Sequence, residues 1–399
     1  MVVQELYIFN PENDLAIANG GMHYMAPPKA RSIAYDLSML PMWYAGANDY
    51  VLCPDADYKN NAQCLIRQFG LFPGLLLPEE IKLYENISSI VPWGWSPEIV
   101  CRLNRWGIDS CHLPTHDSLS QLKRLSHRAI TITILSSLIN YGYSDIPYQL
   151  PLELRTANEV RVFIENAPKT VLKAPWSGSG KGLSWGRGVY DTTLERWSNG
   201  ILKRQGMVIG EPFYEKVRDF AMEFFSDGAG TVSFAGYSLF TTDAKGVYKS
   251  NLLASDETIL AEILQFGIKK YQIERLQKAY IDLLSSLIGM FYRGYLGIDM
   301  MIYNRNGIYH LHPCVEMNLR MNMGMVARIF YDRYVNNWTI GNYYVDYYPD
   351  SAQLWEDHRM RQSKSPLIVS EGKIEKGYFS LAPITSHTHY RARIEIGEE

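Results

Sequence analysis

The sequence predicts a mixed α/β and α+β protein, because two different patterns follow each other along the chain. In the first part, short apolar runs alternate with helical segments, as in parallel α/β layers. From residue 117 onward the pattern changes to helices, a glycine-rich loop and candidates for antiparallel strands. The 399 residues correspond to about two or three domains of roughly 150 residues each.

Composition places the chain among ordinary globular proteins. Hydrophobic residues make up 47% and charged residues 20%, which excludes global disorder. The net charge of −3 argues against a nucleic-acid or polybasic membrane surface, so neither partner is expected. The five cysteines include no C-x-x-C pair, which argues against disulfides and zinc and favours a reducing compartment. Without a signal-peptide pattern or an apolar run of ~20 residues, a cytoplasmic protein is expected.

Residues 1–115 are predicted to form a Rossmann-like N-terminal domain. The first strand candidate, Leu6–Phe9, stops at the polar loop Asn10–Asp14. In an open α/β sheet such a loop lies at the carboxyl edge, where ligands bind. The further strands and helices are predicted at Tyr50–Cys53, Asn61–Phe69, Ile90–Val91 and Glu98–Trp106.

The rest of the chain is predicted to contain a helical segment and first lobe over residues 116–205, a second lobe over 206–345 and a C-terminal extension over 346–399. An amphipathic helix over Ile273–Phe291 is expected to end at Gly294 and Gly297. The other helices are predicted at Ser118–Ser126, Arg128–Asn140 and Asn158–Glu165. Strands are predicted at Thr170–Lys173, at Tyr378–Leu381, at Ala392–Ile396 and, as one antiparallel set, at Met207–Glu211, Phe220–Phe225 and Val232–Tyr237.

The loop Trp176–Gly182 is a candidate phosphate cradle, because its three glycines let backbone N–H groups approach an anion. It differs from a P-loop, since Pro175 and Gly182 replace the first glycine and the Ser/Thr of that motif. A plain flexible hairpin is the alternative interpretation. Lys173, at the end of the preceding strand, can place its ammonium on the same phosphates, or can be a solvated strand-end lysine.

The segment Val208–Glu215 is predicted to leave its sheet at Pro212 and to expose backbone groups that pair with an adenine edge. Glu211 and Glu215 are candidates to accept hydrogen bonds from the exocyclic amine or the ribose hydroxyls. The alternative is ordinary edge-strand charge.

Asn306-Gly307 predicts a hairpin between two strands that carry candidate metal ligands. With these two residues central in the turn, Asp299 is expected to face Cys314, and Glu316 to lie one diagonal step from Asp299 on the same face. Asn318 follows on that face. Oxygen ligands of this kind suit Mg²⁺ that also holds phosphates, whereas a salt bridge is the alternative for a single acid. Pro313 marks a candidate bulge, and the pair His310 and His312 is a rival metal site or ordinary sheet residues.

The order of these motifs resembles the ATP-grasp superfamily over roughly residues 117–330, with the Rossmann-like segment in the place of the N-terminal domain that members carry. The resemblance implies that ATP lies between two α+β lobes and that Arg320 steadies a phosphate or the acceptor carboxylate. Arg128 takes the place of an additional lysine of the family, keeping its charge but not its geometry. The implied nucleotide-binding residues are Arg128, Lys173, Ser177, Gly178, Ser179, Gly180, Lys181, Gly182, Glu211, Phe213 and Glu215, those for Mg²⁺ are Asp299, Glu316 and Asn318, and the catalytic ones are Lys173 and Arg320.

The resemblance also implies a reaction: ATP activates a carboxylate as an acylphosphate, which an amine on a small molecule or peptide then attacks. Such chemistry needs mainly positioning and charge neutralisation, which fits a site of carboxylates, lysine and arginine. Two alternatives stay open, namely a phosphotransferase that does not ligate and a nucleotide-binding regulatory module without turnover. The 28 tyrosines are compatible with a homodimer interface.

Overall fold

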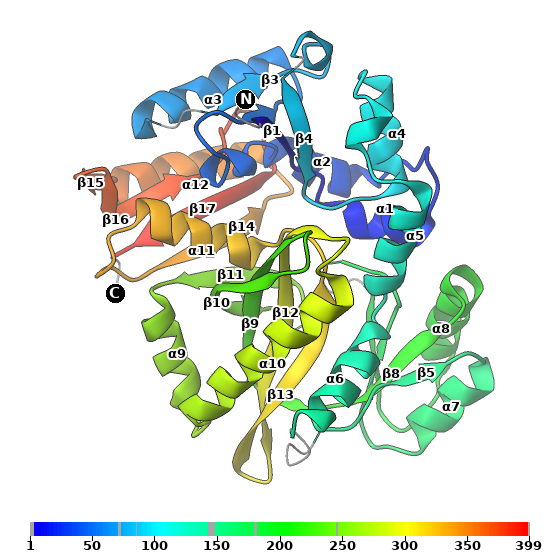
Figure 1. Cartoon of the computed structure of the whole chain (residues 1–399). Coiled ribbons are helices and arrows are strands. Elements are labelled where there is room, and N and C mark those ends of the chain that lie inside the picture. Colours follow the sequence, from blue (N-terminus) through cyan, green and yellow to red (C-terminus); the bar gives the residue numbers. More distant parts are fainter. Residues whose placement is uncertain are drawn as a thin grey trace. The chain divides into compact units, whose positions relative to one another are not determined.

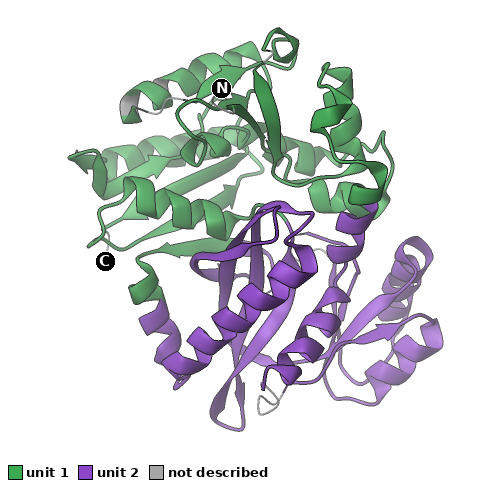
Figure 2. Ribbon diagram, viewed as in Figure 1, with its two compact units in different colours: residues 1–119, 249–259, 320–399 green, residues 120–248, 260–319 purple. Residues whose placement is uncertain are grey.

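We describe a computed structural model of the chain, which covers residues 4–70, 73–84, 86–142, 148–178, 182–244 and 246–397. The chain forms two compact units (Figures 1 and 2). Unit 1 comprises residues 1–119, 249–259 and 320–399, and unit 2 comprises residues 120–248 and 260–319. Unit 1 is therefore built from three separate segments of the chain.

The N-terminal part of unit 1 is a parallel α/β layer. Its sheet has the order β3-β2-β1-β4, formed by β1 (Gln4–Ile8), β2 (Tyr50–Leu52), β3 (Gly74–Leu76) and β4 (Ile87–Pro92). All three pairings are parallel, so the alternation in the sequence correctly predicted a parallel layer. The helices are α1 (Asn13–Asn19), α2 (Pro28–Asp36), α3 (Ala56–Phe69) and α4 (Pro97–Arg105), with 3-10 turns at Leu40–Trp43, Ile81–Leu83 and Ser110–His112. Helix α5 (His116–Leu125) begins in unit 1 and ends in unit 2.

The C-terminal segment completes unit 1 with antiparallel strands. They pair in the order β11-β14-β17-β16-β15, with bounds β11 (Tyr248–Leu253), β14 (Gly341–Tyr347), β15 (Ile368–Ser370), β16 (Lys373–Ser380) and β17 (Tyr390–Ile396). The helices here are α11 (Met323–Tyr334) and α12 (Ser351–Lys364). The indole of the fully buried Trp43 donates to the Leu381 carbonyl at 2.7 Å, which ties the first segment to the last. Asp36 accepts backbone N–H bonds from His389 and Tyr390, both at 2.9 Å.

The larger sheet of unit 2 carries the predicted hairpin. Its strand order is β13-β12-β9-β10, with β9 (Glu215–Asp227), β10 (Val232–Thr242), β12 (Arg293–Arg305) and β13 (Ile308–Asn318). In the turn, Asn306 and Gly307 have φ of 56° and 80°, the two positive values that such a two-residue turn requires. Helix α10 (Lys270–Ile288) packs on β9 and β10, and α6 (Ile130–Asn140) packs on β13 (Figure 1). Helix α9 (Asp256–Leu264) precedes α10.

The prediction that Gly294 and Gly297 end the long helix is wrong. Helix α10 ends at Ile288, one residue before Gly289. A side chain at Gly289 would lie 2.5 Å from the Ser285 carbonyl oxygen and 2.9 Å from that of Gly230. Glycine at position 289 therefore allows the close approach of the Gly230 backbone just after the helix, while Gly294 and Gly297 belong to β12.

The smaller sheet of unit 2 has the order β5-β8-β6-β7 and packs against α7 (Ala157–Glu165) and α8 (Thr192–Gln205). Its strands are β5 (Leu152–Leu154), β6 (Thr170–Lys173), β7 (Leu183–Gly186) and β8 (Val208–Pro212). The expectation that β8 forms one set with β9 and β10 is wrong, because β8 pairs with β5 and β6. The strand ends at Pro212, which has no N–H to donate, and the chain then enters the other sheet at Glu215.

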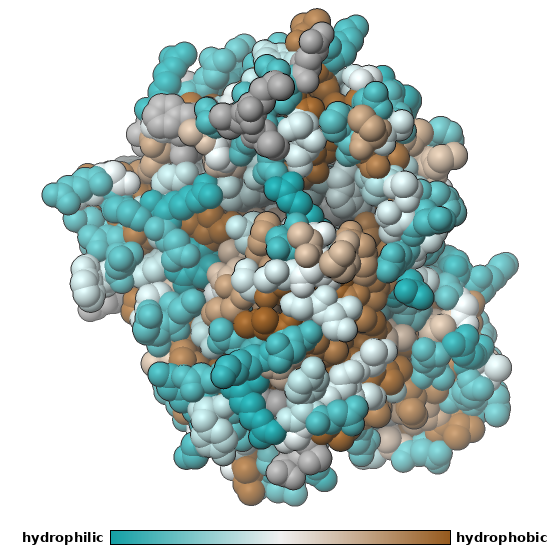
Figure 3. All heavy atoms as spheres, viewed as in Figure 1, coloured by the Kyte–Doolittle hydropathy of each residue, from teal (hydrophilic) through white to brown (hydrophobic). Residues whose placement is uncertain are grey.

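The described residues contain no helix that is both long and apolar enough to cross a membrane. On the face shown in Figure 3, hydrophilic side chains are interspersed with smaller apolar areas.

Candidate nucleotide and metal site

The hairpin of β12 and β13 places two carboxylates directly opposite each other. Asp299 pairs with Glu316, and Gly297 pairs with Asn318. Because alternate residues of a strand share a face, Asp299, Glu316 and Asn318 all lie on one face of the hairpin. The structure thus brings the three predicted metal ligands to the same face, with the two acids closer than the predicted diagonal.

The predicted partner of Asp299, Cys314, is wrong, and the cause is a bulge at Pro313. Pairing follows the predicted register from the turn as far as Met301 and His312, and then shifts by two residues before Asp299. β13 is an edge strand of its sheet. A proline is tolerated there, because its missing N–H can face away from the neighbouring strand. The bulge that Pro313 predicted is confirmed, and it moves Glu316 into line with Asp299.

Arg128 lies just before α6 and contacts both the hairpin and the glycine-rich segment. The side chain is 5% exposed, and its Nη2 donates to the two carboxylate oxygens of Glu316 at 3.0 and 3.2 Å. Nη1 donates to the Ala174 carbonyl at 2.8 Å and to Ser177 Oγ at 2.5 Å. Nε is buried and has no hydrogen-bond partner among the described residues.

Lys173, the last residue of β6, forms an ion pair with Glu211 of β8. Its Nζ lies 2.7 Å from Glu211 Oε2, and the two side chains are only 7% and 9% exposed. Nζ also donates to the carbonyl of Val315 at 3.2 Å. The ammonium therefore lies beside the residue that precedes Glu316, and it already neutralises one buried carboxylate.

The glycine-rich segment connects two antiparallel strands, since Lys173 of β6 pairs with Leu183 of β7. Ala174 N donates to the Gly182 carbonyl at 2.8 Å, which closes the base of this connection. A side chain at Gly182 would meet Ser177 Oγ at 2.0 Å, so glycine is required for this close approach. Ser177, Gly178 and Gly182 are described, whereas the predicted phosphate contacts at Ser179, Gly180 and Lys181 lie outside the described residues.

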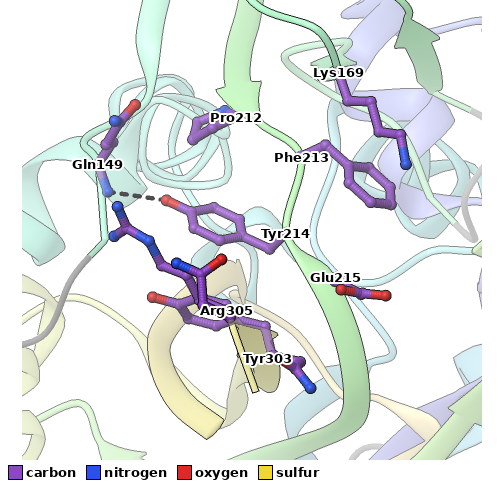
Figure 4. Close-up of a pocket in the computed structure, with 10 residues that line it drawn as sticks. Gln149, Lys169, Pro212, Phe213, Tyr214, Glu215, Tyr303 and Arg305 are labelled. Carbon is purple, nitrogen blue, oxygen red and sulfur yellow. Dashed lines mark hydrogen bonds between the residues drawn. The ribbon is translucent and has the colours of Figure 1, made fainter. Parts of the chain in front are cut away.

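The segment between β8 and β9 lines a cavity of about 540 Å³ (Figure 4). Phe213 and Glu215, both predicted for the nucleotide, belong to this wall. The Lys169 ammonium lies over the Phe213 ring, 5.3 Å from the ring centre. The full lining consists of Gln149, Lys169, Pro212, Phe213, Tyr214, Glu215, Tyr303, Asn304, Arg305 and Asn306.

Tyr214 connects this cavity to the face of the hairpin that carries the acids. Its hydroxyl accepts the Gln149 N–H at 2.9 Å (Figure 4). Its ring centre lies 4.7 Å from that of Tyr303 and 5.0 Å from that of His312. The pairs Asp299–Glu316 and Met301–His312 share one face of the hairpin. The cavity therefore lies farther along the hairpin from the acids, toward the turn.

His312 is buried and neutral. It is 2% exposed, and its Nδ1 has no hydrogen-bond partner among the described residues. Burial, with a smaller contribution from the Lys173 charge, lowers the pKa of His312 to about 3. The described residues contain no group of three or more His, Cys, Asp and Glu side chains suited to a metal ion, which gives the rival metal pair His310 and His312 no third ligand there.

Arg320 belongs to unit 1, where Asp14 engages it. The guanidinium donates from Nε to Asp14 Oδ1 at 2.9 Å and from Nη2 to Asp14 Oδ2 at 2.7 Å. Nη1 donates to the Met321 carbonyl at 3.1 Å. This two-bond geometry is the strong form of an arginine–carboxylate pair. A phosphate or substrate carboxylate on Arg320 has to displace Asp14.

Several residues of this region did not stand out in the sequence. Tyr214, Tyr303, Gln149 and Lys169 carry no motif, and only the pairing of distant strands brings them together. His312 was interpreted as an ordinary sheet or pocket residue. Simple alternation along the strand already predicts one face for His312 and Glu316.

The donor set suits magnesium. Two carboxylates and an amide oxygen are hard ligands, and Mg²⁺ is commonly held by one or two carboxylates together with substrate phosphates. In this structure the positive charge beside Glu316 is the Arg128 guanidinium.

No protein-family profile and no curated protein match the chain in sequence. Solved structures do match it. A biotin carboxylase from Campylobacter jejuni, in complex with β-γ-ATP, has a TM-score of 0.53 and 11% identity, and the match covers 100% of this chain and 88% of the other. An N5-carboxyaminoimidazole ribonucleotide synthetase in complex with ADP has a TM-score of 0.51 and 11% identity, covering 100% and 94%. The match shows a shared fold and confirms the predicted mixed α/β and α+β fold class, in which a parallel α/β layer precedes antiparallel sheets.

Proposed function

We propose that the protein is an ATP-dependent ligase that activates a carboxylate as an acylphosphate for attack by an amine. The observation that carries the proposal is the gathering of Asp299, Glu316, Arg128 and Lys173 around one end of the hairpin in unit 2. Two opposed carboxylates beside two buried cations suit a metal-bound phosphate chain better than a structural core. The fold is that of structures solved with ATP and ADP.

The proposed nucleotide lies along the hairpin face. Its phosphates contact Arg128, Lys173 and the glycine-rich segment, and its base and ribose occupy the cavity beside Phe213 and Glu215. The two residues from Asp299 to Met301 and the two onward to Tyr303 span about 14 Å at ~3.4 Å per residue, which is comparable to an extended nucleotide. Glu211 holds the Lys173 ammonium in place.

In this mechanism the protein contributes position and charge. Asp299, Glu316 and Asn318 would hold Mg²⁺, which supplies neutralisation of the phosphate charge. Arg128 and Lys173 would donate to the same oxygens. The acceptor carboxylate attacks the γ-phosphorus in line and ADP leaves; the amine then attacks the acyl carbon, phosphate leaves and the amine loses a proton. For Arg320 we propose contact with the acceptor carboxylate after release from Asp14. We propose that the acid and the amine are small molecules and that the protein acts in the cytoplasm.

The test is a calorimetric titration of ADP with and without Mg²⁺, comparing the parent with Glu316→Gln. We expect Mg²⁺-dependent ADP binding that the substitution weakens at least tenfold, because a metal ligand loses its charge while the shape is kept. An unchanged unfolding midpoint controls for the fold. No ADP binding by the parent contradicts the nucleotide site, and equal Mg²⁺-ADP affinity in both proteins contradicts the metal assignment.

A second experiment separates ligation from simple phosphoryl transfer. The parent is incubated with Mg²⁺-ATP and pools of carboxylic acids, with and without amines. A ligase forms ADP and a product with a new acyl–nitrogen bond only when an amine is present. A stable phosphorylated product that forms without the amine contradicts ligation.

A further inference from the structure

Arg128 forms several hydrogen bonds within the ligand-free protein. Besides Glu316, its guanidinium donates to Ala174 and Ser177 of the glycine-rich segment. Its own backbone N–H donates to the Pro175 carbonyl at 3.0 Å. The contacts to residues 174–177 keep the guanidinium in place independently of Glu316.

Glu316 depends on Arg128 in a different way. The carboxylate faces Asp299 across the strand pair, and like charges so placed repel each other. The two hydrogen bonds from Arg128 Nη2 supply the positive charge that a metal ion would supply. The two oxygens that accept from Arg128 are also the donor atoms that Glu316 would offer to Mg²⁺.

One hydrogen-bond donor of Arg128 is unpaired within the described residues. Its Nε is buried without a hydrogen-bond partner among the described residues, in a side chain that is 95% buried. An unsatisfied buried donor costs about 1–3 kcal/mol, so the site favours an incoming acceptor oxygen. Phosphate oxygens of a nucleotide are such acceptors, and arginine binds them through two parallel donors.

We propose that Arg128 is a positioning residue that exchanges partners: it holds Glu316 in the ligand-free protein and passes it to the metal when nucleotide phosphates take its place. The proposal rests on the proposed function. Neither ligand alone completes the exchange, because metal alone meets a carboxylate that is already paired, and nucleotide alone leaves Glu316 facing Asp299. Metal and nucleotide binding are thereby coupled beyond their direct contact.

The test uses Mn²⁺ as a spectroscopic probe that accepts the same oxygen ligands, with free Mn²⁺ measured by electron paramagnetic resonance. Mn²⁺ is titrated into the full-length protein with and without ADP. Without ADP, we expect Arg128→Gln to bind Mn²⁺ about tenfold more tightly than the parent, because hydrogen bonds to charged groups contribute about 1.5–3 kcal/mol and Glu316 is released from them. The factor by which ADP tightens Mn²⁺ binding should fall by a similar amount.

Arg128→Lys and Arg124→Gln complete the set. Lysine keeps the charge without the fork, so Arg128→Lys should fall between the parent and Arg128→Gln, and it carries the test if the glutamine variant does not fold. Arg124 is an exposed arginine in the last turn of α5, and its substitution should leave both affinities unchanged. A merely structural role for Arg128 would lower metal affinity or leave it unaltered, so a gain is diagnostic.

The outcomes separate this inference from the proposed function. If the parent binds Mn²⁺-ADP but neither Arg128 variant gains Mn²⁺ affinity without ADP, the exchange is overturned and the nucleotide site stands. If the parent binds no ADP with or without metal, the proposed function fails. A gain in metal affinity in the variants without any ADP binding would keep the Arg128–Glu316 competition and remove its nucleotide half, overturning the exchange as stated.

Discussion

At the residue scale, the ion pair of Lys173 and Glu211 must be treated as a unit. Both side chains are buried, so removing one partner leaves a charge without compensation. We expect Lys173→Met to lower the free energy of unfolding by about 3–5 kcal/mol, measured by urea denaturation. The double variant Lys173→Met with Glu211→Gln should recover most of that stability but none of the ADP affinity. A double variant as unstable as the single one would contradict the pairing.

His312 makes a pH-dependent contribution at the same scale. Its pKa of about 3 in the folded protein lies below the ordinary value of 6.5. Between these two pH values the unfolded chain binds a proton at His312 that the folded chain does not bind. Stability from this residue is complete above pH 6.5 and declines as the pH falls toward 3, with a slope of up to ~1.4 kcal/mol per pH unit. His358, whose pKa burial lowers to about 4, contributes in the same direction.

In the parent, the unfolding free energy should fall between pH 6 and pH 4. We expect His312→Phe to reduce the slope of this fall by about the contribution of one proton. Chemical denaturation at a series of pH values measures it. The exposed His116 offers the control, because His116→Asn should leave the slope unchanged. An equal slope in His312→Phe and the parent would show that folding does not lower the pKa of His312.

At the element scale, the turn of the hairpin fixes the register from which the acids are counted. Gly307 has φ of 80°, and an alanine there costs about 1–2 kcal/mol in the left-handed region. We expect Gly307→Ala to lower the unfolding free energy by that amount in denaturant titrations. The control, Gly200→Ala in the interior of α8, should raise it by roughly 0.5–1 kcal/mol, because alanine favours helix. Equal effects of the two substitutions would contradict the assigned turn.

The same hairpin shows how far the sequence leads. Asn306-Gly307 predicts the turn and, with it, the two strands that flank it. The register beyond Pro313 could not be predicted, because a proline signals a bulge but not how many residues it takes up. The sheet that contains β8 could not be predicted either, because a strand as short as Val208–Pro212 fits either sheet by its sequence pattern. Arg128 and Glu316 are 188 positions apart, and only tertiary packing pairs them.

At the scale of the whole molecule, Trp43 packs against distant segments of unit 1. Its ring meets Phe69, Phe330, Tyr334 and Phe379 edge to face, with ring centres 5.2–5.7 Å apart. Trp43→Ala should lower the stability of unit 1 by about 3–5 kcal/mol. Hydrogen exchange read peptide by peptide should show the loss in β1, β16 and β17. Trp338→Ala is the control, because that side chain is 90% exposed. Faster exchange confined to unit 2 would contradict the assignment.

The three-segment construction of unit 1 affects the order of events on the ribosome. Residues 120–248 and 260–319 are translated before β14, β16 and β17 exist, so unit 2 has the opportunity to fold during synthesis. Asp36 and Trp43 cannot form their hydrogen bonds until Leu381, His389 and Tyr390 have been made, more than three hundred residues later. Throughout that interval the nascent chain exposes the apolar surface around Trp43, and it is in this period that a chaperone would be needed.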